Sequence, residues 1–336
     1  IVTTGNGSYG IGLDKQTGTR VTAVSTTGDG SGGLELSQSR DVTVSALTAA
    51  DEPAGVFTHV NNTNVVLDQL TITGGRRGVV IEKTTQGLTL QGSTVQGASV
   101  AAIADDGKDV AIHGVAVRDS RTALRVERGA DGVTASDLTI SGGQDGVVAA
   151  PGSTGLVLQD LRTDGLAGTG VRSASPDARI LGGAITGGAT GIDVAAATSI
   201  SGTSIRMTDQ GIRAESTGLV HADDVDVDAV SVGIDTGDAG PFLLTRSQVH
   251  ALEAVRGTLT AEGTNDLSLP PLNLLGAIGI PLILLAVSLQ VIAALRGRRF
   301  GGDTRRIPPG LPGAASTARV PSAAPARGPL TDAPAA

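Results

Sequence analysis

Four residues whose side chains can move protons or hold cations recur at one spacing in the first half of the chain. They are His59, Glu82, Asp105 and Glu127, which lie 22 or 23 residues apart. If a structural repeat stacks them, neighbouring carboxylates lie about 4.8 Å apart. Their mutual repulsion then raises their pKa values or attracts a cation. We expect no resident cofactor. If the row does hold a cation, Glu82, Asp105 and Glu127 are the candidate ligands and calcium is the candidate metal.

The same row suggests a catalytic set and a binding strip. Two stacked acids lie near the separation used by retaining glycosidases, and acids two repeats apart lie near that of inverting ones. His59, Glu82, Asp105, Glu127 and Arg125 are the candidate catalytic residues if the protein is an enzyme.

The residues that come two positions before each member of this row are expected to form a mainly apolar strip beside it. The candidate ligand-binding residues are Phe57, Val80, Ile103 and Arg125. Three interpretations stay open for the row and the strip together: a solvated acidic face, weak cation or polymer binding, and catalysis.

The element that must position these residues is a repeat of about 22 residues. Each unit opens on a small residue followed by alternating apolar positions, which is a strand signal. It continues with apolar alternation broken by a turn residue, as in the segment from Val65 to Ile72. The openings are Gly10, Gly33, Gly55, Gly78, Ala101, Ala123, Gly146, Gly170, Gly191, Gly211, Gly233 and Ala254.

This pattern resembles the right-handed parallel β-helix of the pectate-lyase-like superfamily. The resemblance implies an all-β solenoid of about 11–12 coils over residues 1–268, whose stacked units share one core. In enzymes of that superfamily, catalytic and calcium-binding groups project from the outer face of the sheet that the opening strands resemble. The Asp-Pro-His-Asp motif of alginate epimerases and the Gly-His-Gly motif of polygalacturonases are both absent. The uniform coil length also leaves no long loop to wall a cleft.

The second half of the chain tests this alignment. Two residues after the opening residue, successive units carry opposite charges in alternation, which predicts cross-strand ion pairs. The predicted ladder is Arg172, Asp193, Arg213, Asp235 and Arg256.

Composition narrows the class of protein further. The chain has 336 residues, with 49 Gly, four aromatic residues, no Trp and no Cys, so disulfides and Cys-based sites are excluded. Residues 1–295 carry 18 basic and 31 acidic side chains, a net charge of −13. A surface this acidic argues against nucleic-acid binding.

Residues 272–295 form an uncharged run of 24 residues, followed at once by Arg296, Arg298 and Arg299. The run is long enough to cross a bilayer, and the arginines predict a cytoplasmic C-terminal side. Residues 296–336 are basic and rich in Pro and Ala, which predicts a disordered cytoplasmic tail. We therefore expect a single-pass plasma-membrane protein with residues 1–268 outside the cell. Because an exported chain needs a leader and this one starts at Ile1, we also expect a longer precursor.

The functional expectation is a non-enzymatic, membrane-anchored surface protein of bacterial type. Its rod acts as a spacer or binds a polysaccharide or another surface protein. The alternative is a polysaccharide lyase, hydrolase or epimerase that uses the acidic row.

Overall fold

The computed structural model describes residues 1–237 and 240–269, which fold into one parallel β-solenoid of about 12 coils. This confirms the expected all-β solenoid. The described part consists of strands, bends and turns, and none of its residues lies in a helix able to span a membrane. The predicted membrane segment 272–295 and tail 296–336 lie outside the described residues.

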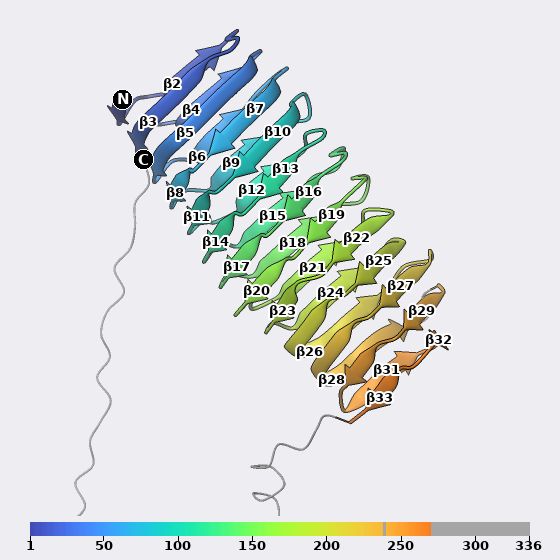
Figure 1. Ribbon diagram of the computed structural model, residues 1–336. Coiled ribbons are helices and arrows are strands. Elements are labelled where there is room, and N and C mark those ends of the chain that lie inside the picture. Colours follow the sequence, from blue (N-terminus) through green and yellow to red (C-terminus); the bar gives the residue numbers. More distant parts are fainter. Residues whose placement is uncertain (238–239, 270–336) are drawn as a thin grey trace, which may run out of the picture. The chain divides into compact units, whose positions relative to one another are not determined.

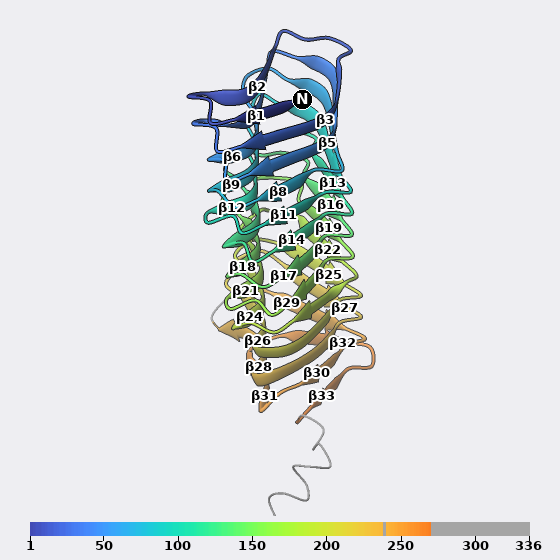
Figure 2. The same ribbon diagram turned by 90° about the vertical axis from the view of Figure 1, so that its left-hand side faces the viewer.

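The strands stack on three long faces, and every pairing joins a strand to its counterpart one coil later in parallel (Figures 1 and 2). Face I holds the opening strands of the repeat. Its strands are β2 (Tyr9–Asp14), β4 (Gly32–Ser37), β6 (Ala54–Thr58), β9 (Arg77–Ile81), β12 (Ala101–Asp105), β15 (Thr122–Val126), β18 (Asp145–Ala149), β21 (Thr169–Ser173), β24 (Thr190–Val194) and β31 (Glu253–Gly257).

Faces II and III follow face I in each coil. Face II holds β7 (Thr63–Asp68), β10 (Gln86–Gln91), β13 (Ala111–His113), β16 (Thr134–Ser136), β19 (Val157–Gln159), β22 (Ala178–Leu181), β25 (Thr198–Ser201), β27 (Val220–Asp223), β29 (Phe242–Thr245) and β32 (Thr260–Glu262). Face III holds β1 (Val2–Thr4), β8 (Thr71–Thr73), β11 (Thr94–Gln96), β14 (Ala116–Arg118), β17 (Thr139–Ser141), β20 (Arg162–Asp164), β23 (Ala184–Thr186), β30 (Gln248–His250) and β33 (Asp266–Ser268).

Four longer strands curve around an edge of the solenoid and belong to two faces. β3 (Arg20–Thr27) and β5 (Arg40–Ala50) join face II to face III, and β26 (Ser204–Ala214) and β28 (Asp226–Gly237) join face III to face I.

The core is a narrow column of aliphatic side chains between the three faces. Inward positions carry Val, Leu, Ile and Ala, and Phe242 is the largest side chain in it. Because each coil is only one strand wide on each face, small branched residues fill the column, which accounts for the scarcity of aromatic residues.

The bend between faces II and III requires a left-handed backbone in successive coils. Asp137, Asp160, Gly182, Gly202 and Asp224 occupy this bend in five consecutive coils, all with φ between 52° and 68°. Gly has no Cβ penalty in this region, and Asp tolerates it through local hydrogen bonds. The turn residues that interrupt the apolar alternation are therefore these left-handed bends.

Side chains from the next coil cap backbone N–H groups at several edges. The Leu70 N–H donates to Ser93 Oγ at 3.0 Å, and the Val225 N–H donates to Ser247 Oγ at 3.1 Å. At these bends the serine oxygen accepts the hydrogen bond that a backbone carbonyl oxygen would accept in a regular sheet. The buried N–H groups therefore stay hydrogen-bonded.

The glycine that opens most face I strands is required by crowding. A Cβ on Gly191 would lie 2.4 Å from Ile205 Cγ2 and 2.7 Å from the Gly211 carbonyl oxygen in the next coil. Gly12, which faces outward from the same face, has no atom within 4 Å of such a Cβ.

We therefore predict that Gly191→Ala lowers the free energy of unfolding by about 1–3 kcal/mol, the cost of overpacking. Gly12→Ala is the matched control, and its effect stays within about 0.5 kcal/mol. Urea denaturation followed by circular dichroism measures both variants. Equal stabilities of the two variants would contradict the crowding argument.

Candidate functional site

The charge ladder on face I has the register that the sequence predicts. Arg172 pairs with Asp193, Asp193 with Arg213, Arg213 with Asp235, and Asp235 with Arg256 on successive strands. Arg172 Nε lies 3.4 Å from Asp193 Oδ2, and Arg256 Nη1 lies 3.6 Å from Asp235 Oδ2.

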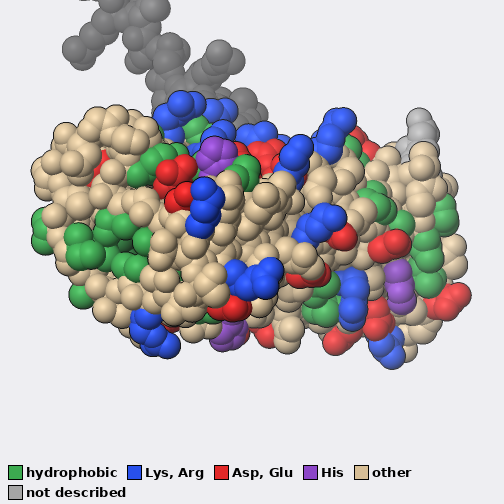
Figure 3. Space-filling view, turned by 90° about the horizontal axis from the view of Figure 1, so that it is seen from above, with side chains coloured by type: hydrophobic (Ala, Val, Ile, Leu, Met, Phe, Trp, Pro, Cys, Tyr) green, Lys and Arg blue, Asp and Glu red, His purple; other side chains and the backbone are tan. Residues whose placement is uncertain are grey.

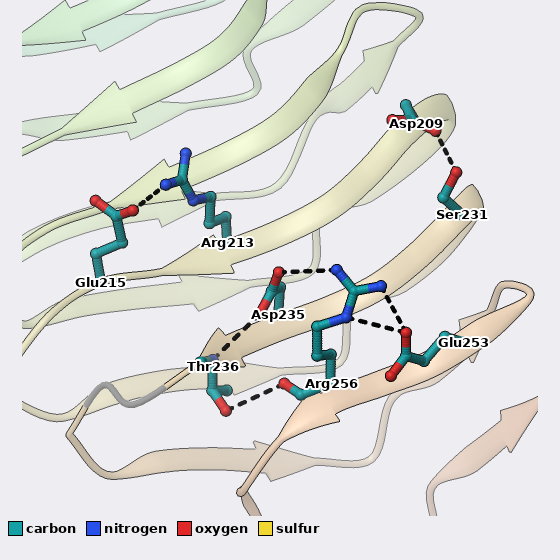
Figure 4. A network of polar contacts seen from close by, with 9 residues as sticks. Asp209, Arg213, Glu215, Ser231, Asp235, Thr236, Glu253 and Arg256 are labelled. Atoms are coloured by element: carbon teal, nitrogen blue, oxygen red, sulfur yellow. Dashed lines mark hydrogen bonds and ion pairs between the residues drawn. The ribbon is translucent and has the colours of Figure 1, made fainter.

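Acids on neighbouring columns add to the ladder (Figure 4). Arg213 forms an ion pair with Glu215, which directly follows β26, and Arg256 donates to Glu253 Oε2 at 2.7 Å. A hollow of about 410 Å³ lies over Arg213, Glu215 and Asp235. Because these charges neutralise one another, the ladder has a structural explanation without a ligand.

The predicted register is wrong in the coil that contains β12. Val79 pairs with Ile103, Val80 with Ala104, and Ile81 with Asp105, so this strand is shifted by one residue from the expected alignment. Ile103 and Asp105 consequently point into the core and are 0% exposed. The opening residue of the coil is Ala102, and the coil before it has one residue more than expected.

This shift changes both the predicted acidic row and the predicted apolar strip. Asp106 takes the outward place between Glu82 and Glu127 that was expected for Asp105, and Ala104 takes the strip position expected for Ile103. The trio of Glu82, Asp105 and Glu127 therefore does not converge on one outward site. His59, Glu82 and Glu127 keep their expected positions, and Arg125 Nε pairs with Glu127 Oε1 at 2.8 Å.

Asp105 is a buried carboxyl group with one hydrogen-bonded oxygen. Its Oδ1 accepts a hydrogen bond from the Gly107 N–H at 2.8 Å, while Oδ2 is buried without a partner among the described residues. Burial raises the pKa of Asp105 from 3.8 to about 7. The carboxyl group turns the chain after β12, and its place inside the core removes it from the candidate catalytic set.

A cluster of three rings lies on face I over the first coils. Tyr9 and Phe57 stack with ring centroids 6.2 Å apart, and His59 meets Phe57 edge-on at 5.4 Å. His59 Nδ1 lies 3.3 Å from Glu35 Oε1. Burial raises the pKa of Tyr9, and the charges of Glu35 and Glu82 raise it further. We call Tyr9, Phe57 and His59 the ring cluster.

Sequence reasoning found Phe57 and His59 but missed Tyr9 and its neighbour Glu35 as parts of one site. Tyr9 precedes the first opening glycine and pairs with Gly32 on the next strand, so the repeat of small opening residues does not mark it. The available signal is that Tyr9 belongs to the first opening strand, which lies on the same face as the strand of Phe57.

Besides the hollow over Arg213, two further hollows lie on the outer side of face I, and both are edged by arginines. The first, of about 170 Å³, is lined by Tyr9, Phe57, Val80, Arg76 and Arg77, among others. Figure 3 shows one side of the solenoid, on which basic and acidic side chains are interspersed.

The second hollow, of about 310 Å³, continues on later coils. Its lining includes Arg121, Arg125, Val148 and Arg172. Unlike Arg125 and Arg172, the residues Arg76, Arg77 and Arg121 have no carboxylate within 4.0 Å in the described part of the chain. Guanidinium groups thus lie near the starts of the face I strands, and Glu82, Asp106 and Glu127 follow the ends of these strands. The ring cluster lies over the first coils.

The class of protein that this architecture defines is a parallel β-solenoid with a shallow, charged face. A family model described as "Periplasmic copper-binding protein (NosD)" matches residues 2–159, a little under half of the chain. No curated protein matches the chain.

Solved structures of similar fold include several carbohydrate-active proteins. A GH87 α-1,3-glucanase from Streptomyces thermodiastaticus strain HF3-3 has 14% identity and a TM-score of 0.48, covering 77% of this chain and 64% of its own. The AlgE6 A-module, a mannuronan C-5 epimerase of Azotobacter vinelandii, has 12% identity and a TM-score of 0.45, covering 74% and 91%. The tailspike protein of E. coli bacteriophage HK620, in complex with a pentasaccharide, has 9% identity and a TM-score of 0.46, covering 74% and 60%. The chain spans between half and two thirds of the length of three GH87 α-1,3-glucanase structures that it matches, the Streptomyces one included.

The donors present do not fit a copper site. Copper favours Cys, Met and His ligands, yet the chain has no Cys and one Met, Met207, which is 69% exposed. The four histidines lie on separate coils and have other partners, such as Ser136 for His113 and Thr245 for His221. Within residues 1–237 and 240–269, no group of three or more metal-binding side chains converges.

We predict that Asp105 gives the protein a pH-dependent stability that Asp105→Asn removes. The folded state keeps the Asp105 proton up to about pH 7, whereas the unfolded chain loses it near its ordinary pKa. This stability is therefore fully present at low pH and is lost as the pH rises through the folded pKa. Between about pH 5 and about pH 7, the wild type should lose about 2–3 kcal/mol relative to the Asn variant. Urea denaturation of both proteins across this range measures the difference, and parallel pH profiles would contradict the prediction.

Proposed function

We propose that the chain is an extracytoplasmic, membrane-anchored binding protein whose face I holds an acidic polysaccharide. The observation that carries the proposal is the ring cluster beside Arg76 and Arg77, at a hollow that also contains Val80. Aromatic rings bind the apolar faces of sugars, and guanidinium groups bind carboxylates through paired hydrogen bonds.

The charge pattern of face I favours a sugar that carries both carboxylate and hydroxyl groups. Arg76, Arg77 and Arg121 have no acid partner within 4.0 Å in the described residues, so a ligand carboxylate can pair with them without breaking an ion pair. On the opposite side, Glu82 offers oxygens that accept hydrogen bonds from hydroxyl groups. A chain of uronate sugars lying along the solenoid axis supplies both kinds of group at each residue.

The sequence supports a location outside the cytoplasm. The matching family model describes a periplasmic protein. Residues 272–295 carry no charge and precede a cluster of arginines, the pattern of a membrane anchor with its C-terminal side in the cytoplasm. We place the rod outside the membrane on this basis.

The binding test compares an acidic polysaccharide, such as polyuronate, with a neutral glucan by calorimetry. Phe57→Ala and Arg77→Ala should each weaken polyuronate binding about tenfold, because one ring contact or charge-assisted hydrogen bond is worth about 1.5 kcal/mol. Arg162→Ala is the matched control, since Arg162 is also exposed and has no carboxylate within 4.0 Å in the described residues, but it lies on face III. Equal losses in the Arg77 and Arg162 variants would refute the site.

A turnover assay separates binding from catalysis. We expect the protein to bind polyuronate without shortening or epimerising it, with or without calcium. Product formation that is lost in Glu82→Gln or Glu127→Gln, with binding retained, would replace this proposal with the enzymatic alternative.

A further inference from the structure

The core of the solenoid is left open at its C-terminal end within the described residues. On face III, Val227 and Val249 are 0% exposed, but Leu267, which pairs with Val249 on the last strand, is 42% exposed. On face II, Leu244 is buried and its counterpart Ala261 is exposed. Inward-facing positions of the last coil therefore present apolar side chains where the next coil would lie.

Two further leucines extend this apolar end. Leu252 and Leu269 are 70% and 68% exposed. The Ala251 N–H donates to the Ser268 carbonyl oxygen at 3.2 Å. Leu252 directly follows Ala251 and Leu269 directly follows Ser268, so the two leucines lie on neighbouring stretches of chain. We call Leu252, Leu267 and Leu269 the end leucines. Figure 2 shows β31 and β33, the strands next to them, at the terminal end of the solenoid.

Chain connectivity restricts what covers the end leucines. Leu269 and Leu272, where the uncharged run begins, are separated by two prolines. Three Cα–Cα steps span at most about 11 Å. The headgroup region on each side of a bilayer is about 5–7 Å thick. A bilayer that holds residues 272–295 therefore brings its headgroup region within reach of the end leucines.

The charges near this end favour apolar contact over attraction to anionic lipids. Glu253 is paired with Arg256, and Asp266 lies 3.5 Å from His250 Nε2. Glu262 adds a further acid. Since basic residues do not predominate here, contact with lipid must come from burial of leucine side chains at the boundary between headgroups and acyl chains.

We infer that the C-terminal end of the solenoid is a lipid-contacting surface, with the end leucines inserted into the interface of a zwitterionic bilayer. This inference rests on the membrane anchoring proposed above. It adds a second contact between the protein and the bilayer, made by the folded domain itself.

The absence of tryptophan from the sequence allows a direct test. Leu252→Trp and Leu269→Trp each place a single fluorophore at the end, and Val2→Trp places one on a side chain that is 77% exposed in the first strand, β1. The full chain is reconstituted into phosphatidylcholine vesicles. Flotation measures anchoring, and quenching by lipids that are brominated near the headgroup measures contact of the fluorophore with lipid.

We expect the Leu252→Trp and Leu269→Trp proteins to float with the vesicles, to emit at shorter wavelength than the Val2→Trp protein, and to lose fluorescence to the brominated lipid. Flotation with solvent-like, unquenched emission at both end positions would overturn the inference and leave the anchoring intact. Short-wavelength emission without quenching would show that protein covers the end, and would also overturn it. Failure to float would overturn both the anchoring and the inference.

Discussion

The structure depends on one geometric constraint, the stacking of each residue on its counterpart in the next coil. Parallel pairing places equivalent positions about one strand spacing apart, so a side chain must suit the side chains directly above and below it. Crowded inward corners select Gly, as at Gly191, because the backbone of the next coil occupies the space of a Cβ. Exposed columns select opposite charges, as between Arg172 and Asp193.

The same constraint made the fold predictable. The period of about 22 residues and the charge ladder follow from the repeated pattern of residue types, and the structure confirms both. The pattern misplaced β12, because Ala101 and Ala102 are both small enough to open the strand. The expected alignment put Asp105 on the outside, because burying a carboxyl group is costly. The molecule places it inside, where one backbone hydrogen bond offsets part of that cost.

The candidate site was less predictable than the fold, because it combines positions that the repeat does not mark. Tyr9 stands before the first opening glycine, and Arg76 stands before the strand that carries Val80. Each is ordinary within its own coil, and only their common face and hollow join them to Phe57. Sequence periodicity identifies what successive coils share, whereas a binding site is made of what distinguishes a few of them.

The extra residue before β12 has a consequence for how such chains tolerate change. In a messenger RNA, one inserted nucleotide changes the reading frame of every codon downstream. Here the shift at Ala102 ends within its own coil, because the pairing of Ile103 with Leu124 restores the expected register on the next strand. The register of each strand is therefore fixed by its pairing with the neighbouring coil and not by the number of residues that precede it. Insertions and deletions at the edges can accumulate in such a protein without disturbing distant coils, and a binding face can lengthen or shorten by whole coils while its remaining parts stay in place.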